Sequence, residues 1–167
     1  MNRREFLKKS LEGIVLGSIP LISSCGKNPV DSEQDLDTNP IIKDSIEYYV
    51  QTDKSVYKLG ENVEMLYRVT NLKNEDVTFR FPHSPQYNFW IEKDGEVIWR
   101  AINGWWTVIT EFTLSPNNSK EFNYIWDMKD NENILVNVGK YSVIGGLYAG
   151  SGNYVHTKVS VPIEIIP

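Results

Sequence analysis

Residues 63–70 read VEMLYRVT, and this stretch decides the fold. Apolar side chains occupy every second position, and the residues between them are mostly polar. Side chains of an extended chain point alternately to its two faces, so one face of this segment enters a core and the other meets water. The stretch therefore predicts a β-strand that lies at the surface of a sheet-built core.

The same alternation recurs along most of the chain beyond residue 43. It is found in Val77–Phe81, Tyr87–Ile91 and Phe122–Trp126. Asp94-Gly95 separates two apolar runs and is typical of a type I′ hairpin turn. Residues 154–165 predict a closing strand, in which Pro162 indicates an edge or a bulge. These patterns predict an all-β domain, an antiparallel β-sandwich of about seven to nine strands rather than a barrel.

The first 24 residues resemble a bacterial export signal. A basic segment with Arg3 and Arg4 precedes an apolar run at residues 13–22, which is well short of the about 20 residues that span a bilayer. Arg-Arg followed by Glu-Phe-Leu-Lys resembles a twin-arginine signal, with the general export route as the alternative. Ile22-Ser23-Ser24-Cys25 resembles the lipobox of bacterial lipoproteins, which implies cleavage before Cys25 and lipidation of this cysteine.

Residues 25–43 are expected to form a flexible acidic tether behind the lipidated cysteine. They carry alternating acidic residues and little apolar surface. They also lack the central glycine and final glutamate of an EF-hand calcium loop. No aspartate follows Cys25, which by resemblance to lipoprotein sorting indicates the outer membrane in a cell that has one. The folded domain, residues 44–167, is then expected in the cell envelope, outside the cytoplasm.

Composition and charge narrow the classes of partner. The chain has 17 Lys and Arg against 22 Asp and Glu, a net charge of −5. Nucleic-acid binding needs clustered basic residues, so this class is not expected. Cys25 is the only cysteine, so no disulfide is available to the domain. A domain of this length can bury a sufficient core without one, and we expect it to be monomeric.

The sequence shows no catalytic constellation. It has two histidines, His83 and His156, and a zinc or copper site would need at least three converging ligands. Neither a metal nor another cofactor is therefore expected. Gly150-Ser151-Gly152 lacks the spacing of a nucleophile elbow and is expected to be a turn. We expect a binding protein rather than an enzyme.

Five tryptophans are more than a core of this size requires. Trp99 and Trp126 are expected to pack inward, whereas Trp90 falls on the outward face of its strand. Of the adjacent pair Trp105 and Trp106, one should be buried and one exposed. An exposed tryptophan can stack on a sugar or fill a partner's pocket, and half-burial under a loop is the alternative. The candidate binding surface consists of His83, Gln86, Trp90, Trp105 and Trp106.

A series of motifs in fixed order resembles the BsuPI family, which is named for an intracellular proteinase inhibitor. The motifs are Tyr57–Glu61, Val63–Asn71, Val77–Phe79, Ser84–Phe89, Asp94-Gly95, Val97–Arg100, Asn103-Gly104, Leu114–Pro116 and Gly139–Tyr141. The resemblance covers roughly residues 47–147. Asn117-Asn118 departs from the usual glycine-glutamate of the family, and the export signal departs from its intracellular namesake. The resemblance implies an Ig-like β-sandwich and, as a function, proteinase inhibition.

Two hypotheses about function follow. The first is a lipid-anchored, non-catalytic module that binds another protein, with a proteinase as one such partner. The second is a glycan-binding, adhesive or structural module of the cell envelope, supported by the tryptophans and the expected location. The sequence leaves both open.

Overall fold

The computed structural model describes residues 39–104, 106–148 and 157–167. The segment expected to be an export signal, Cys25 and most of the expected tether lie outside these residues. Within them the chain forms strands only, and no helix has the length and apolar character to cross a membrane. The strands are β1 (Ile41–Lys43), β2 (Ile46–Thr52), β3 (Val56–Lys58), β4 (Val63–Asn71), β5 (Val77–Phe81), β6 (Tyr87–Lys93), β7 (Glu96–Arg100), β8 (Thr110–Leu114), β9 (Ser119–Trp126), β10 (Gly139–Leu147) and β11 (Lys158–Ile166).

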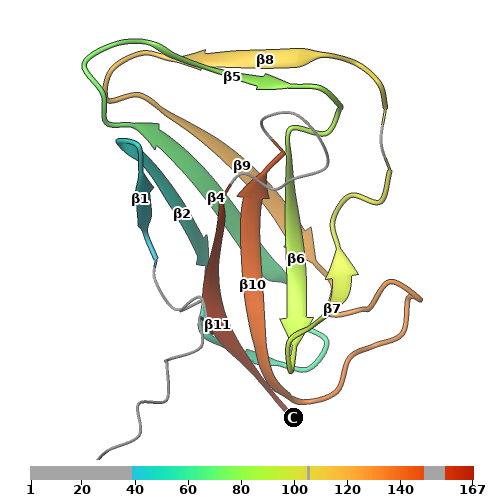
Figure 1. Cartoon of the computed structure of the whole chain (residues 1–167). Coiled ribbons are helices and arrows are strands. Elements are labelled where there is room, and N and C mark those ends of the chain that lie inside the picture. The colour runs from blue at the N-terminus through green and yellow to red at the C-terminus, as the bar shows by residue number, and fades with distance from the viewer. Residues whose placement is uncertain (1–38, 105, 149–156) are drawn as a thin grey trace, which may run out of the picture. The chain divides into compact units, whose positions relative to one another are not determined.

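The strands form an Ig-like β-sandwich, which confirms the predicted fold class. One sheet has the order β1-β2-β4-β9 and the other β3-β11-β10-β6-β7, while β5 and β8 form a separate pair (Figure 1). Aromatic rings join the two large sheets across the core: the Tyr87 and Phe122 ring centroids are 4.3 Å apart, and those of Trp99 and Trp126 are 6.1 Å apart. Short strands such as β1 and β3 bring the total for the described residues to eleven, above the expected number.

Strand β4 shows the predicted alternation in full. Val63, Met65, Tyr67 and Val69 are at most 2% exposed, and the residues between them are exposed or half-buried. The core side of β4 packs closely against β10, because a Cβ placed on Gly145 would lie 2.6 Å from a ring atom of Tyr67. Glycine is therefore required where these two sheets approach.

The predicted turn at Asp94-Gly95 is confirmed. Lys93 pairs with Glu96, and the two residues between them have φ values of 52° and 82°. Positive φ at both central positions defines the type I′ turn, whose twist matches that of the flanking strands.

Strand β11 closes the second sheet, as predicted from residues 154–165. Pro162 pairs with Ser142 of β10, and β3 covers β11 only from Glu164 to Ile166. Pro162 therefore lies where β11 has a partner on one side, a position that tolerates the missing N–H. The pairing of β11 with β3 is parallel, which departs from the expected all-antiparallel arrangement.

Strand β1 lies before residue 44, the expected start of the folded domain. Residues 41–43 form β1, which pairs with β2 through a turn at Asp44-Ser45, where both residues have positive φ. Asn39 fixes the chain just before β1, since its side chain donates to Val50 O at 2.6 Å and accepts from Val50 N at 3.1 Å. The turn at Asp44-Ser45 and the hydrogen bonds of Asn39 thus order residues 39–43, although their composition predicted disorder.

Candidate binding surface

The loop between β5 and β6 is paired with the loop between β7 and β8. Ser84 N donates to Trp106 O, and Trp106 N donates to Ser84 O, each at 3.0 Å. The Ser84-Pro85 peptide bond is cis, and Pro85 is buried while its neighbours are half-buried. The structure therefore brings together two segments that the sequence separates by more than twenty residues.

Beside this pairing, three large apolar side chains lie in solvent. The exposed fractions are 60% for Trp106, 54% for Val108 and 62% for Ile109. Val108 N donates to Trp106 O at 2.8 Å, so the chain turns tightly after the tryptophan. We call Ser84, Trp106, Val108 and Ile109 the Trp106 surface. Exposed apolar groups gathered in one place are typical of a contact site for another molecule.

Asn88 holds the start of the loop that carries this surface. Its side chain is fully buried, and it pairs with the backbone of Ile102: Nδ2 donates to Ile102 O at 2.9 Å, and Oδ1 accepts from Ile102 N at 3.0 Å. Nδ2 also donates to Tyr148 Oη at 2.8 Å. The loop is thus fixed at Ile102 by a side chain and at Trp106 by a backbone pair.

The expectation that Trp90 faces solvent is wrong. Trp90 is only 5% exposed, although it lies on the face of β6 that alternation predicted to meet solvent. The Trp90 ring packs edge-on against Tyr148 with centroids 5.9 Å apart, and Lys158 Nζ lies 5.1 Å from the ring centroid. Trp90 is therefore a packing residue and is not part of the candidate binding surface.

The other predicted surface residues have mixed positions. His83 and Gln86 are half-buried in the loop that pairs with Trp106. Trp105 and His156 lie outside the described residues. Trp126 is fully buried, and Trp99 packs against it, in line with the inward positions expected for both. Sequence reasoning missed Val108, Ile109 and Asn88, because their roles depend on loop geometry rather than on residue pattern.

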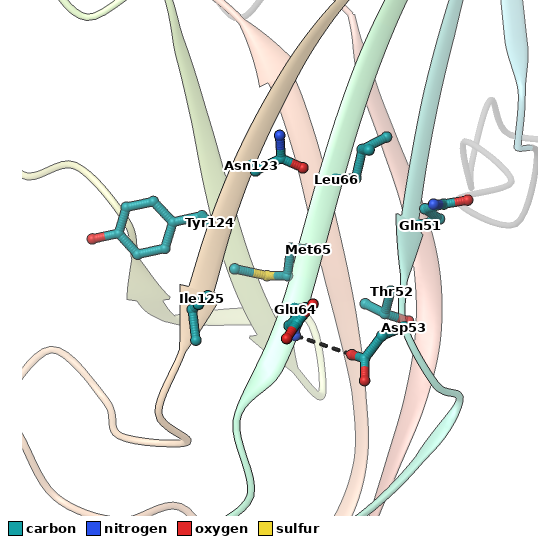
Figure 2. Close-up of a pocket in the computed structure, with 9 residues that line it drawn as sticks. All are labelled: Gln51, Thr52, Asp53, Glu64, Met65, Leu66, Asn123, Tyr124 and Ile125. Carbon is teal, nitrogen blue, oxygen red and sulfur yellow. Dashed lines mark hydrogen bonds between the residues drawn. The ribbon is translucent and has the colours of Figure 1, made fainter.

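A shallow concavity of about 350 Å³ lies on β2, β4 and β9, at the opposite face of the first sheet from the core. Gln51, Glu64, Leu66 and Asn123 line it together with Ile125, which is 57% exposed (Figure 2). Amide and carboxylate groups beside aliphatic side chains can hydrogen-bond the hydroxyl groups of a polar ligand. The aromatic residue at the edge, Tyr124, packs its ring toward Phe89 and Trp99 instead of across the opening.

The carboxylate of Asp53 at the edge of this concavity has a structural task. Its Oδ1 accepts a hydrogen bond from Tyr57 Oη at 2.6 Å. It also accepts one from Glu64 N at 3.0 Å (Figure 2). Partial burial favours the neutral acid, but these hydrogen bonds and the nearby Lys54 outweigh it and lower the pKa of Asp53. A general acid at neutral pH would need the opposite shift.

Potential metal ligands do not gather in the part of the chain that the structure describes. There, no group of three or more His, Cys, Asp or Glu residues is arranged to hold an ion.

The described residues thus form a β-sandwich with exposed apolar side chains on a pair of hydrogen-bonded loops. A model of the BsuPI family, described as intracellular proteinase inhibitor, matches residues 50–150. The match covers more than half of the 167 residues, and the chain belongs to this family. Membership in a family of inhibitors favours a binding role over a catalytic one.

Several solved structures resemble the chain at low identity. A β-glucosidase from Erythrobacter marinus has 14% identity and a TM-score of 0.44, with 73% of this chain and 15% of that chain covered. The alkylpurine DNA glycosylase AlkC from Pseudomonas fluorescens has 10% identity and a TM-score of 0.45, with 72% and 30% covered.

The CARDB domain of a Pyrococcus furiosus protein has 12% identity and a TM-score of 0.41, with 72% of this chain and 91% of that chain covered. TM-scores this low support no conclusion about function. The chain spans less than a third of the β-glucosidase and of the glycosylase. No curated protein sequence matches the chain.

Proposed function

We propose that this chain is an exported, lipid-anchored domain that binds and inhibits a proteinase through the Trp106 surface. Family membership supports the class of partner, since the BsuPI model is that of a proteinase inhibitor. The export signal and the lipobox-like Cys25 support the location. A partner outside the cytoplasm would distinguish this chain from the intracellular inhibitor that gives the family its name.

The observation that carries the proposal is the exposure of Trp106 on a loop that the domain holds in place. Tryptophan is enriched among the residues that dominate protein interfaces, and its large ring loses little conformational entropy on binding. The 3.0 Å backbone pair with Ser84 and the Asn88 contacts to Ile102 restrict the loop before a partner arrives. Restriction of this kind lowers the entropic cost of association.

The binding half of the proposal is tested by inhibition assays. The full chain with Cys25→Ala, which removes the lipid, is titrated against subtilisin, chymotrypsin, elastase and trypsin with chromogenic substrates. We expect at least one activity to fall at stoichiometric protein, and Trp106→Ala to weaken that inhibition at least tenfold, as for a hot-spot residue. Full activity of all four proteinases at excess protein would overturn the proposal.

The location is tested by the mass of the protein from a producing cell. We expect a mass equal to residues 25–167 plus acyl chains for the natural sequence, and no acylated form for Cys25→Ala. An unmodified chain that retains Met1 in the cytosol would contradict export. It would also favour an intracellular proteinase as the partner.

Glycan binding is the second candidate, favoured by the amide and carboxylate groups of the concavity on β2, β4 and β9. Binding of cell-envelope oligosaccharides, measured by calorimetric titration, would then be weakened by Asn123→Ala and unchanged by Trp106→Ala. No such binding is expected if the partner is a protein.

A further inference from the structure

The segment between β9 and β10 contains a small hairpin that sequence reasoning did not identify. Val136 N donates to Met128 O at 2.9 Å, and Lys129 forms an antiparallel bridge with Leu135. Asp130 N donates to Ile134 O, also at 2.9 Å, which leaves residues 131–133 as the loop. We call residues 128–136 the protruding hairpin.

Side chains fix the tip of the protruding hairpin. Asp130 Oδ1 accepts hydrogen bonds from Glu132 N and Ile134 N, both at 2.9 Å. Asn133 has a φ of 64°, a conformation that asparagine tolerates and that short hairpin loops of this kind require. The backbone of the tip is therefore held in one conformation by contacts within the hairpin itself.

The protruding hairpin is also attached to the edge of β7. Asn131 N donates to Ile98 O, and Asn131 Oδ1 accepts from Arg100 N, each at 3.1 Å. These contacts occupy backbone groups of a sheet edge, which otherwise could pair with another chain. The hairpin thus has a fixed orientation relative to the sheet, and β7 continues directly into the loop that carries Trp106.

Two aliphatic side chains project from this fixed element. Ile134 is 57% exposed and Leu135 is 48% exposed. Exposure of both means that neither side chain packs into the core. Figure 1 shows this segment, in orange between β9 and β10, extending outward beside β7. Packing of the core does not account for this projection.

We propose that the protruding hairpin enters the active-site cleft of the inhibited proteinase and places Ile134 and Leu135 in apolar subsites. The inference rests on the proposed function and adds the element that recognises the cleft. A narrow projection fits a concave partner, a preorganised loop loses little entropy on binding, and aliphatic side chains gain by leaving water. The hairpin contacts β7 at Ile98 and Arg100, and the loop that carries Trp106 begins where β7 ends.

The test compares single charge substitutions at positions of similar exposure. Ile134→Asp and Leu135→Asp place a carboxylate where an apolar subsite would receive the side chain. Ile42→Asp is the matched control, since Ile42 is 61% exposed on β1, at the edge of the other sheet. Each variant is made in the full chain with Cys25→Ala, melted to establish that it folds, and titrated against subtilisin, chymotrypsin, elastase and trypsin.

We expect Ile134→Asp and Leu135→Asp to weaken inhibition of chymotrypsin or elastase at least tenfold, with melting temperatures near that of the parent chain. Ile42→Asp should inhibit as the parent does. Trypsin, whose primary pocket takes basic side chains, should be inhibited least by the parent. Inhibition that both hairpin variants retain in full would overturn this inference alone and leave the role of Trp106 standing. A parent chain that inhibits no proteinase would overturn the proposed function and this inference with it.

Discussion

At the residue scale, Asn88 determines where a loop runs. A buried amide in a strand is costly unless every donor and acceptor finds a partner. Here the side chain supplies one acceptor to the backbone N–H groups of Phe89 and Ile102 and donates to Ile102 O and Tyr148 Oη. The side chain therefore pairs with the backbone of Ile102 as a neighbouring strand would. This pairing fixes the segment that leads from β7 to Trp106.

Asn88→Ala is expected to destabilise the domain by about 2–4 kcal/mol, because it leaves buried backbone groups without partners. Asn123→Ala, at an exposed position of β9, should change the free energy of unfolding by less than about 0.5 kcal/mol. Urea unfolding followed by fluorescence measures both. Equal stability of the two variants would show that the contacts of Asn88 do not hold the loop.

At the scale of elements, much of the sandwich could be predicted from the sequence and some of it could not. In β4 and β9 one face is exposed and the other is buried, so polar and apolar residues alternate visibly in the sequence. In β6 both faces are buried, so Trp90, which alternation placed on the outward face, is not exposed. Burial of the second face depends on Tyr148, which is distant in sequence. The alternation within β6 alone could not predict this contact.

The candidate site was predictable only in part, for a related reason. The exposed tryptophan after a turn and the neighbouring loop at residues 83–86 could be identified from residue types. The protruding hairpin could not, because its rigidity comes from Asp130 and Asn131 contacting backbone atoms. Acidic and amide residues in such a segment are equally typical of an ordinary solvated loop.

The β6–β7 hairpin offers a test of turn chemistry. Gly95 has a φ of 82°, and a Cβ added there would meet no atom within 4 Å. Gly95→Ala should therefore cost about 1 kcal/mol from backbone strain alone. Gly95→Asn should cost less, because asparagine tolerates this conformation. Thermal melting ranks the two variants, and an alanine variant at least as stable as the parent chain would contradict the type I′ assignment.

At the scale of the whole molecule, the core is rich in tyrosines whose ionisation burial opposes. Burial and the hydrogen bond to Asp53 raise the pKa of Tyr57 to about 12. Burial raises the pKa of Tyr67 well above its usual value of 10.0. It is also the main cause of the raised pKa values of Tyr48, Tyr87 and Tyr148.

These shifts predict that the domain loses stability in alkali. Below pH 10 the tyrosines are neutral in the folded and unfolded chains, and their contribution is fully present. As the pH rises from 10 toward 12, the unfolded chain releases protons that the folded chain retains, so the free energy of unfolding falls. Urea unfolding at pH 8 and pH 11 measures the loss, and Tyr67→Phe should reduce it. A free energy of unfolding that is equal at the two pH values would contradict this description of the core.

The proposed inhibitor binds its proteinase through the Trp106 surface and the protruding hairpin. Amide hydrogen exchange of the full chain with Cys25→Ala, alone and with the proteinase that it inhibits, locates the contact. We expect slower exchange in the complex at residues 106–109 and 130–136, and unchanged exchange in β2 and β4. Slower exchange confined to β2, β4 and β9 would place the partner on the concavity and overturn the proposed binding surface.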